Sequence, residues 1–412
     1  MNIGVIGMDL NPPLNEGIKN TVYEIYKRII KRGIEVLLIT RGMLNGMKQP
    51  HHNNMEVLEY EGLKIYPIPI KQGTIYTHLT GAPSFIATLP IYLRKICDRT
   101  PIELFHVHTS FATVNSFIAL QLKSLFILER PKVVITQYSS ICNPYVFGEF
   151  DFKSLLVPLL MNYKILKCMP ADLVITLNKR ARYSFKKHFA KKVAWFPHIA
   201  VDTERFKPDK KCEMIIRSEL SIDDETIVLL YAGDLTPTRG VEFFISIVKY
   251  FAKHYQVKGL IPLKDSNVNI NRYNYVTSLL KKSGIEKYVE ILSYRDDINC
   301  IINSSNIVIM PLRNNYGFMD LPRFLLEAMS CGKPVITTTV GAITDVLYNW
   351  VNGVLCEPDD LKCFITSVKT LIENPSLRYN LGENARKTIL ETFDAKKVSD
   401  KLLWIYINLM EK

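Results

Sequence analysis

Short runs of aliphatic and β-branched residues alternate with longer segments of helical periodicity along most of this 412-residue chain, and this alternation limits its fold more than any other feature. A first strand is predicted at Ile3–Ile6. A helix follows it, in which apolar residues recur at helical spacing until Gly33, and residues 35–40 then predict the next strand. Strands that alternate with helices in this way form parallel sheets, so we expect an α/β protein.

Two such series follow each other and predict two domains, in agreement with a length that exceeds one ordinary core. The fold class that we expect is α/β, with two Rossmann-like doubly wound domains facing each other across a cleft. The predicted domains are 1–198, 199–385 and a terminal helix at 386–412 that packs back toward the N-terminal domain. The further predicted strands lie at 64–70, 104–108, 132–138, 171–177, 193–197, 226–233, 257–263, 288–292, 306–312, 334–340 and 353–358.

The chain is basic, with a formal net charge of +12. This excess indicates either a polyanionic neighbour, such as nucleic acid, anionic lipid headgroups or a phosphorylated substrate, or simply a lysine-rich surface in water. The basic residues are spread along the chain and form no platform interleaved with aromatic residues. We therefore expect no nucleic-acid partner.

The eight cysteines are scattered and form no C-x-x-C pair, which predicts reduced thiols and no zinc framework in an intracellular protein. The N-terminal residues enter a strand-like run without the features of a signal peptide. The longest apolar stretches, 117–128 and 155–161, are too short or too charged to span a bilayer. We expect a cytoplasmic protein, at most peripheral at the inner face of the membrane.

One short helix is strongly delimited within the stretch GFMDLPRFLLEAMSCGKPVIT, residues 317–337. Pro322 suits its first turn and Gly332 its C-terminal cap. Its N-terminus would offer free N–H groups to a phosphate in the cleft. Glu327 lies among apolar residues about two turns into the helix, and its carboxylate could accept from both hydroxyls of a ribose. The alternative is an ordinary glutamate on the exposed face of the helix.

Several motifs occur together in the order and spacing of a known family. They are ELFHVHTSFA, FPHIAVDTERFKP, YAGDLTPTRGVEFFI and LLEAMSCGKPVITTTVGAITDVLYNWVNGVLCEPDD. With them the chain resembles, over its whole length, the retaining nucleotide-sugar glycosyltransferases of the family 4 type, which have the GT-B fold. The resemblance implies a retaining hexosyltransferase.

The resemblance also implies roles for individual residues. Glu327 would hold the ribose of the donor nucleotide, and Arg239 would neutralise its diphosphate. Gly17 would let the backbone approach donor or acceptor, and His108 would hydrogen-bond a sugar hydroxyl or the reacting centre. The alternatives are a surface charge for Arg239 and an ordinary turn glycine for Gly17. His106 is interpreted as structural.

Two residues depart from the family pattern. Met319 stands where the family has a glutamate that contacts the donor sugar, and Asp320, one position later, either substitutes for it or caps the helix. Asp234 stands where the phosphate loop has an arginine, so that Arg323 or Lys264 would have to supply the missing charge. These departures leave the expected fold intact and leave the activity open.

The function that we expect is transfer of a sugar, with retention, from a nucleotide-diphosphate donor to a lipid-linked or cell-surface glycan. A catalytically inactive or regulatory subunit, or a nucleotide-sugar epimerase of the same fold, is the alternative. We expect no cofactor and no metal, because a helix N-terminus and basic side chains can carry the phosphate charge. The segments IYLRK and FKSLLVPLLMNYKILK suggest contact with an anionic membrane surface, or else amphipathic core helices.

Overall fold

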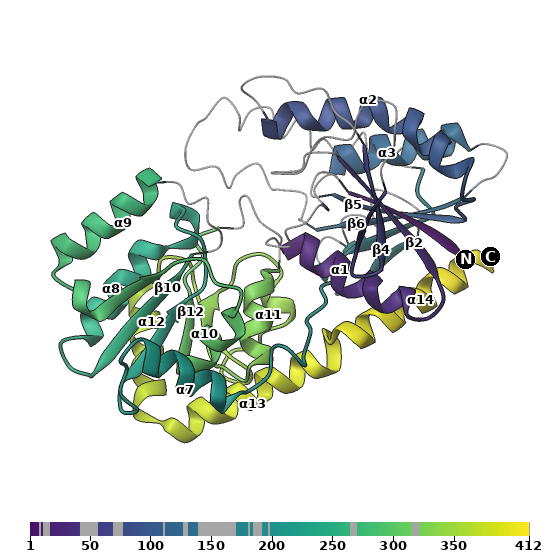
Figure 1. Ribbon diagram of the computed structural model, residues 1–412. Coiled ribbons are helices and arrows are strands. Elements are labelled where there is room, and N and C mark those ends of the chain that lie inside the picture. Colours follow the sequence, from purple (N-terminus) through teal and green to yellow (C-terminus); the bar gives the residue numbers. More distant parts are fainter. Residues whose placement is uncertain are drawn as a thin grey trace. The chain divides into compact units, whose positions relative to one another are not determined.

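A computed structural model shows the chain as two compact units (Figure 1). Unit 1 comprises Met1–Ala200 and Ala395–Lys412, and unit 2 comprises Val201–Asp394. The structure describes residues 1–7, 10, 17–41, 57–68, 77–109, 112–126, 131–138, 170–179, 182–183, 192–196, 198–263, 270–314 and 321–411.

Unit 1 is built on a sheet with the strand order β3-β4-β2-β1-β5-β6-β7-β8. All neighbouring strands are parallel except β3, which runs antiparallel to β4 at the edge. The strands are β1 (Asn2–Ile6), β2 (Glu35–Arg41), β3 (Leu58–Tyr60), β4 (Leu63–Ile68), β5 (Leu104–Thr109), β6 (Lys132–Gln137), β7 (Leu173–Thr176) and β8 (Val193–Trp195), and the helices are α1 (Gly17–Ile30), α2 (Thr77–Cys97), α3 (Ala112–Leu125) and α14 (Ala395–Met410).

Successive residues of β5 point to opposite faces of this sheet and enter different cores. Phe105 and Val107 belong to the core that also contains apolar side chains of α2 and α3. Leu104 belongs to the second core, which α1 and α14 cover. In Figure 1, α14, drawn in yellow, runs beside α1. His106 and His108 have the same strand parity as Leu104, so two polar side chains enter the second core.

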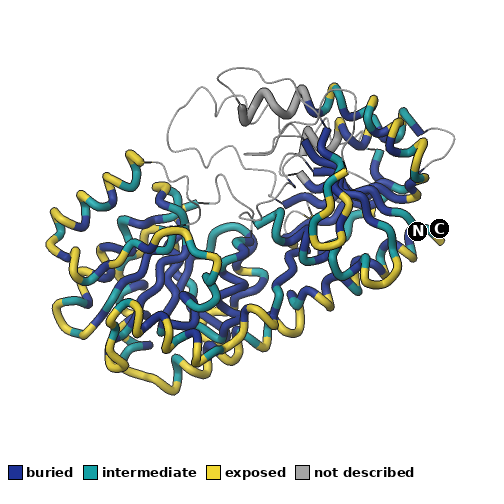
Figure 2. Tube along the Cα trace, in the orientation of Figure 1, coloured by how far each residue is buried: buried dark blue, intermediate teal, exposed yellow. Residues whose placement is uncertain are grey.

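Unit 2 has a fully parallel sheet with the order β11-β10-β9-β12-β13-β14. Its strands are mostly buried, as the dark blue trace in Figure 2 shows. The elements are α7 (Lys210–Glu219), β9 (Ile227–Tyr231), η2 (Pro237–Arg239), α8 (Val241–Phe251), β10 (Val257–Pro262), α9 (Ile270–Ser283), η3 (Glu286–Tyr288), β11 (Val289–Leu292), α10 (Ile298–Ser304), β12 (Ile307–Met310), α11 (Arg323–Ser330), β13 (Val335–Thr338), η4 (Ile343–Asp345), β14 (Val354–Cys356), α12 (Leu361–Glu373) and α13 (Pro375–Thr392).

Three local predictions need correction. The short edge strand β3 was not predicted, because three residues offer too little alternation to recognise. The single terminal helix expected at 386–412 is two helices, since α13 ends at Thr392 and α14 starts at Ala395. Pro322 lies one residue before α11 rather than in its first turn.

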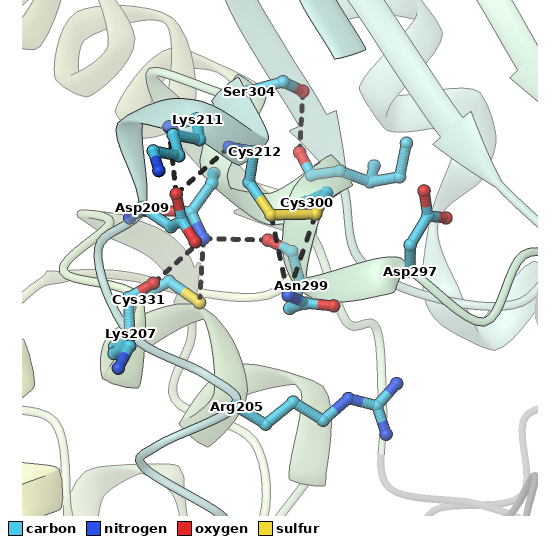
Figure 3. The surroundings of a disulfide bond; sticks show 12 residues. Arg205, Lys207, Asp209, Lys211, Cys212, Asp297, Asn299, Cys300, Ser304 and Cys331 are labelled. Atoms are coloured by element: carbon cyan, nitrogen blue, oxygen red, sulfur yellow. Dashed lines mark hydrogen bonds between the residues drawn. A yellow bond between two sulfur atoms is a disulfide. The ribbon is translucent and has the colours of Figure 1, made fainter. Parts of the chain in front are cut away.

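The prediction of reduced cysteines is wrong for four of them. Cys212 of α7 and Cys300 of α10 form a disulfide, and Cys356 and Cys363 form a second one. Figure 3 shows the first bond with Asn299, whose side-chain amide donates to both sulfur atoms at 3.7 Å. The prediction relied on the lack of close C-x-x-C pairs, but the fold joins cysteines that are 88 residues apart in the sequence.

Candidate functional site

The chain order of unit 2 defines where a ligand would bind. From β9 the chain continues outward through β10 and β11, and it then returns to the other side of β9 to form β12. The order therefore reverses between β9 and β12, which are parallel neighbours. In open α/β sheets, ligands bind at such a switch point, beyond the carboxyl ends of the two strands. The segment after β9 carries Arg239, and the helix that follows β12 along the chain carries Glu327.

Helix α11 buries almost its whole length. Leu325 and Leu326 are fully buried, and Gly332, two residues after the helix end, has the left-handed conformation that the sequence predicts for a cap, with φ 69°. Glu327 is only 8% exposed. The alternative of an exposed helical glutamate is therefore wrong, and a buried carboxylate needs a partner.

The partner of Glu327 is Arg323, one turn earlier on the same helix. The Nε of Arg323 donates to Oε1 of Glu327 at 2.7 Å, and both side chains are at least nine-tenths buried. Nη1 of Arg323 is also buried and has no hydrogen-bond partner among the residues that the structure describes. A buried guanidinium N–H without a partner is costly, and an anionic oxygen is the acceptor it suits best.

The loop after β9 holds a second arginine close to an acid. Nε of Arg239 lies 3.5 Å from Oδ2 of Asp234, whose backbone carbonyl accepts from the hydroxyl of Tyr231 at 2.7 Å. Burial lowers the pKa of Arg239, and the nearby Asp234 carboxylate opposes this shift. Asp234, which stands where the family pattern has an arginine, is thus the ion-pair partner of Arg239, the predicted phosphate-binding residue.

Gly240 brings this loop against the end of β12. It has φ 70°, and a Cβ at this position would lie 2.2 Å from the carbonyl oxygen of Pro311. A side chain would therefore push the Arg239 loop away from the segment after β12. The backbone N–H of Arg313 also donates to the carbonyl of Thr238 at 3.0 Å, so the two segments of the switch point are held together.

The remaining predicted residues fall in different places. Gly17 is the first residue of α1 and is half-buried. His108 lies on β5 of unit 1 and is 2% exposed. Asp320, Met319 and Lys264 lie outside the residues that the structure describes.

His108 is part of a buried polar cluster that the sequence analysis did not predict. Its Nε2 lies 3.0 Å from the hydroxyl of Tyr26 in α1, and its Nδ1 lies 2.9 Å from the hydroxyl of Tyr138. Tyr26 also contacts the hydroxyl of Tyr406 in α14 at 2.7 Å. His198, which follows β8, completes the cluster, with its ring centroid 5.2 Å from that of His108. In the sequence, only the spacing of His106 and His108 two residues apart on a predicted strand pointed to this cluster, and no local rule connects that pair to His198.

Unit 2 is similar to a known protein family. Residues 213–388 match the family described as glycosyl transferases group 1. The match includes both segments of the switch point, with Arg239 and the α11 residues Arg323 and Glu327.

Relatives of similar length extend the likeness to the whole chain. It is 21% identical to an N-acetyl-α-D-glucosaminyl L-malate synthase of Bacillus anthracis, covering 98% of this chain and 97% of that protein. It is 23% identical to the UDP-Gal:α-D-GlcNAc-diphosphoundecaprenol α-1,3-galactosyltransferase of Escherichia coli, covering 89% and 95%.

A solved structure shares the fold. The sucrose-phosphate synthase of Thermosynechococcus elongatus superposes with a TM-score of 0.80 at 18% identity, covering 100% of this chain and 99% of that chain. The predicted fold class, two doubly wound α/β units of the GT-B type, is confirmed. Among the described residues, the structure contains no helix with the length and apolar character needed to cross a bilayer.

Proposed function

We propose that this chain transfers a hexose, with retention of configuration, from a nucleoside-diphosphate donor to the hydroxyl of a glycan acceptor. The observation that carries the proposal is the buried Arg323–Glu327 pair, whose arginine has a hydrogen-bonding group without a partner among the described residues. The pair lies on the helix after β12, and Arg239 lies on the loop after β9, so both belong to the switch point of the sheet.

Each group of this site has a role toward the donor. The carboxylate of Glu327 would accept from the ribose hydroxyls. Nη1 of Arg323 would donate to a phosphate oxygen, and Arg239 would add a second positive charge. Two guanidinium groups in a poorly solvated site can stabilise the diphosphate without a metal ion.

In the transfer step, the bond between the anomeric carbon and the diphosphate oxygen breaks, and its electron pair leaves with the diphosphate. Negative charge develops on the diphosphate as this bond breaks. Arg239 and Arg323 stabilise that charge in the transition state more than in the bound donor, and this accelerates departure of the diphosphate. The acceptor oxygen forms the new bond to the anomeric carbon and gives its proton to the departing phosphate oxygen. We keep His108, Asp320 and Gly17 as the proposed residues near the sugar and the acceptor.

The acceptor that we propose is a lipid-linked glycan at the inner face of the membrane. The support is the name of the Escherichia coli relative, which specifies a UDP-sugar donor and a diphosphoundecaprenol-linked acceptor. The excess of 12 positive charges favours approach to an anionic lipid surface and to a diphosphate.

A second candidate function is that of an inactive or regulatory subunit. The ion pair between Asp234 and Arg239 favours it, because a carboxylate 3.5 Å from the phosphate-binding arginine competes with a diphosphate for that cation. A subunit of this kind would bind nucleotide sugars weakly and would release no nucleotide.

Isothermal calorimetry with UDP-, GDP- and ADP-sugars, followed by assay of nucleotide release with a lipid-linked acceptor, tests these functions. We expect Glu327→Gln to abolish binding and Glu391→Gln, a matched change at an exposed position of α13, to leave it intact. Binding without nucleotide release would favour the inactive subunit, or an epimerase if the recovered sugar has changed configuration. If the wild-type chain binds no nucleotide sugar, the transferase proposal fails.

A further inference from the structure

Three histidines from separate parts of unit 1 form one compact group. His106 and His108 lie on β5, and His198 follows β8. All three are buried, and each offers one ring nitrogen such that the three nitrogens lie within 4.8 Å of one another. The ring centroids of His106 and His108 are 3.9 Å apart, and that of His198 lies 5.3 Å from His106.

All three rings are buried in the interior of unit 1. Burial lowers the pKa of His198 to about 3. Burial, together with the neighbouring imidazoles, also places the pKa values of His106 and His108 well below the usual range. A neutral imidazole has a lone pair on one nitrogen, and this is the form that binds metal ions.

One ring nitrogen of the three histidines has no hydrogen-bond partner among the described residues. Nε2 of His198 is buried and has no hydrogen-bond partner among the described parts of the chain. The other nitrogen of this ring, Nδ1, lies 3.4 Å from the hydroxyl of Tyr138. If Nδ1 carries the proton and donates to Tyr138, Nε2 presents a lone pair to the interior of unit 1. A buried lone pair without a donor is unfavourable, and a cation would satisfy it.

In the rings of His106 and His108, one nitrogen contacts a hydroxyl group, as is common for the non-ligating nitrogen of a metal-bound histidine. Nε2 of His106 lies 2.8 Å from Oγ1 of Thr136, and Nδ1 of His108 lies 2.9 Å from the hydroxyl of Tyr138. Such contacts fix the tautomer and orientation of a ligating histidine. The hydroxyl of Tyr26 lies 2.9 Å from Nδ1 of His106 and 3.0 Å from Nε2 of His108, so it could supply a fourth ligand atom.

We infer that His106, His108 and His198 bind one divalent transition-metal ion, of the Zn²⁺ class, inside unit 1. Imidazole ligands favour zinc, copper or nickel over magnesium and calcium. Zinc–nitrogen bonds of about 2.0–2.1 Å place tetrahedral ligand atoms about 3.4 Å apart, so ring nitrogens that now lie within 4.8 Å of one another would draw together by at most about 1.4 Å. The ion would tie β5 to the segment after β8, and it would give His108 a structural role in place of the role near the sugar proposed above. This inference does not depend on the proposed transferase activity.

The test uses the full chain, unfolded and refolded with excess zinc or cobalt chloride and then desalted, because a buried site has to be filled as the chain folds. We expect about one ion per chain by mass spectrometry of the metal content, and visible absorption typical of tetrahedral Co²⁺. His198→Gln should lower the bound metal at least tenfold. His254→Gln, a change at an exposed histidine of unit 2, should leave it unchanged and so corrects for surface binding.

Zinc should also raise the melting temperature of the wild-type and His254→Gln chains but not that of His198→Gln. If refolded wild-type protein retains no metal above the level of His198→Gln, the inference is overturned. Because the wild-type metal content is measured directly, this result stands even if His198→Gln folds poorly. The inference would also be overturned if the His254→Gln chain bound no metal while the His198→Gln chain still bound it.

Discussion

Arg323 and Glu327 face each other across one turn of α11, with Nε of the arginine 2.7 Å from Oε1 of the glutamate. The pair resolves a question that the sequence leaves open, namely why a carboxylate stands among buried apolar residues. The arginine neutralises it, and the same arginine retains a further N–H group for a ligand. The same two side chains therefore form a structural ion pair and part of the proposed binding site. Mutations can separate their contribution to stability from their contribution to ligand binding.

The first prediction concerns the stability that this pair provides. Glu327→Leu leaves the buried charge of Arg323 without its partner and should lower the free energy of unfolding by about 3–5 kcal/mol. The double change Arg323→Met with Glu327→Leu removes both charges and should recover most of this loss. Urea unfolding measures both variants, and calorimetry should show that neither of them binds a nucleotide sugar. Equal destabilisation of the single and double variants would contradict a coupled pair.

A second prediction concerns Asp234, which lies 3.5 Å from Arg239. Asp234→Asn removes the competing anion and keeps an oxygen that can accept from the backbone N–H of Thr236. The carboxylate is one-third exposed, so solvent weakens its effect, and we expect nucleotide-diphosphate affinity to increase about two- to tenfold. Asp224→Asn makes the same change in net charge at an exposed position and should leave the affinity unchanged. Weaker binding by Asp234→Asn would show that the carboxylate assists the donor site.

Lys333 provides a prediction for the pH dependence of stability. Its Nζ donates to the carbonyl of Asn303 at 2.7 Å, and burial lowers its pKa to about 8 although Glu213 partly opposes the shift. Between pH 8 and about 10.4, the pKa of an unfolded lysine, the unfolded chain binds more protons than the folded one. This group therefore makes the protein more stable as the pH rises through that window.

Lys333→Met should remove this pH dependence of stability. The variant should be more stable than the wild type at pH 7, and the difference in stability between the two should become smaller above pH 8. Melting temperatures measured from pH 7 to 10.5 provide the comparison. Lys281→Met, at an exposed position of α9, is the matched control and should follow the wild-type curve. If the melting temperatures of wild type and Lys333→Met changed with pH in parallel, burial would not lower the pKa of Lys333, and the prediction would be wrong.

The two disulfides should differ in the stability they confer. The Cys212–Cys300 bond spans 88 residues and the Cys356–Cys363 bond spans 7. From loop length alone, the entropy of the unfolded chain assigns about 4–5 kcal/mol to the first and about 2 kcal/mol to the second. Replacing each pair by serines should therefore lower the melting temperature more for the first pair. Peptide mapping that finds free thiols at Cys212 and Cys300 in protein kept under air would contradict the pairing.

Local patterns were sufficient for much of the fold. The run 35–40 is continuous and rich in aliphatic residues, as a strand buried on both faces should be, and it lies in β2. The cap at Gly332 could be predicted because only glycine adopts its conformation without strain. Each of these signals lies within a few residues of the structure it specifies.

The features that were missed depend on distant residues. His198 lies 90 positions from His108 in the sequence, and Cys300 lies 88 positions from Cys212, so no helical or strand period relates them. The burial of Glu327 was likewise undecidable from its helix, because it depends on how the rest of unit 2 packs around α11. The sequence could suggest the residues of the donor site but not which of them are paired with one another.

The hydrogen bond between Tyr26 and Tyr406 has a consequence for biosynthesis. It joins the first helix of unit 1 to α14, whereas the whole of unit 2 lies between them in the chain. During translation, the ribosome completes residues 201–394 before it makes the helix that covers one core of unit 1. Unit 2 can therefore finish folding on the ribosome, whereas the earlier-made unit 1 has to wait for its last helix, with its histidine-rich interior uncovered until then.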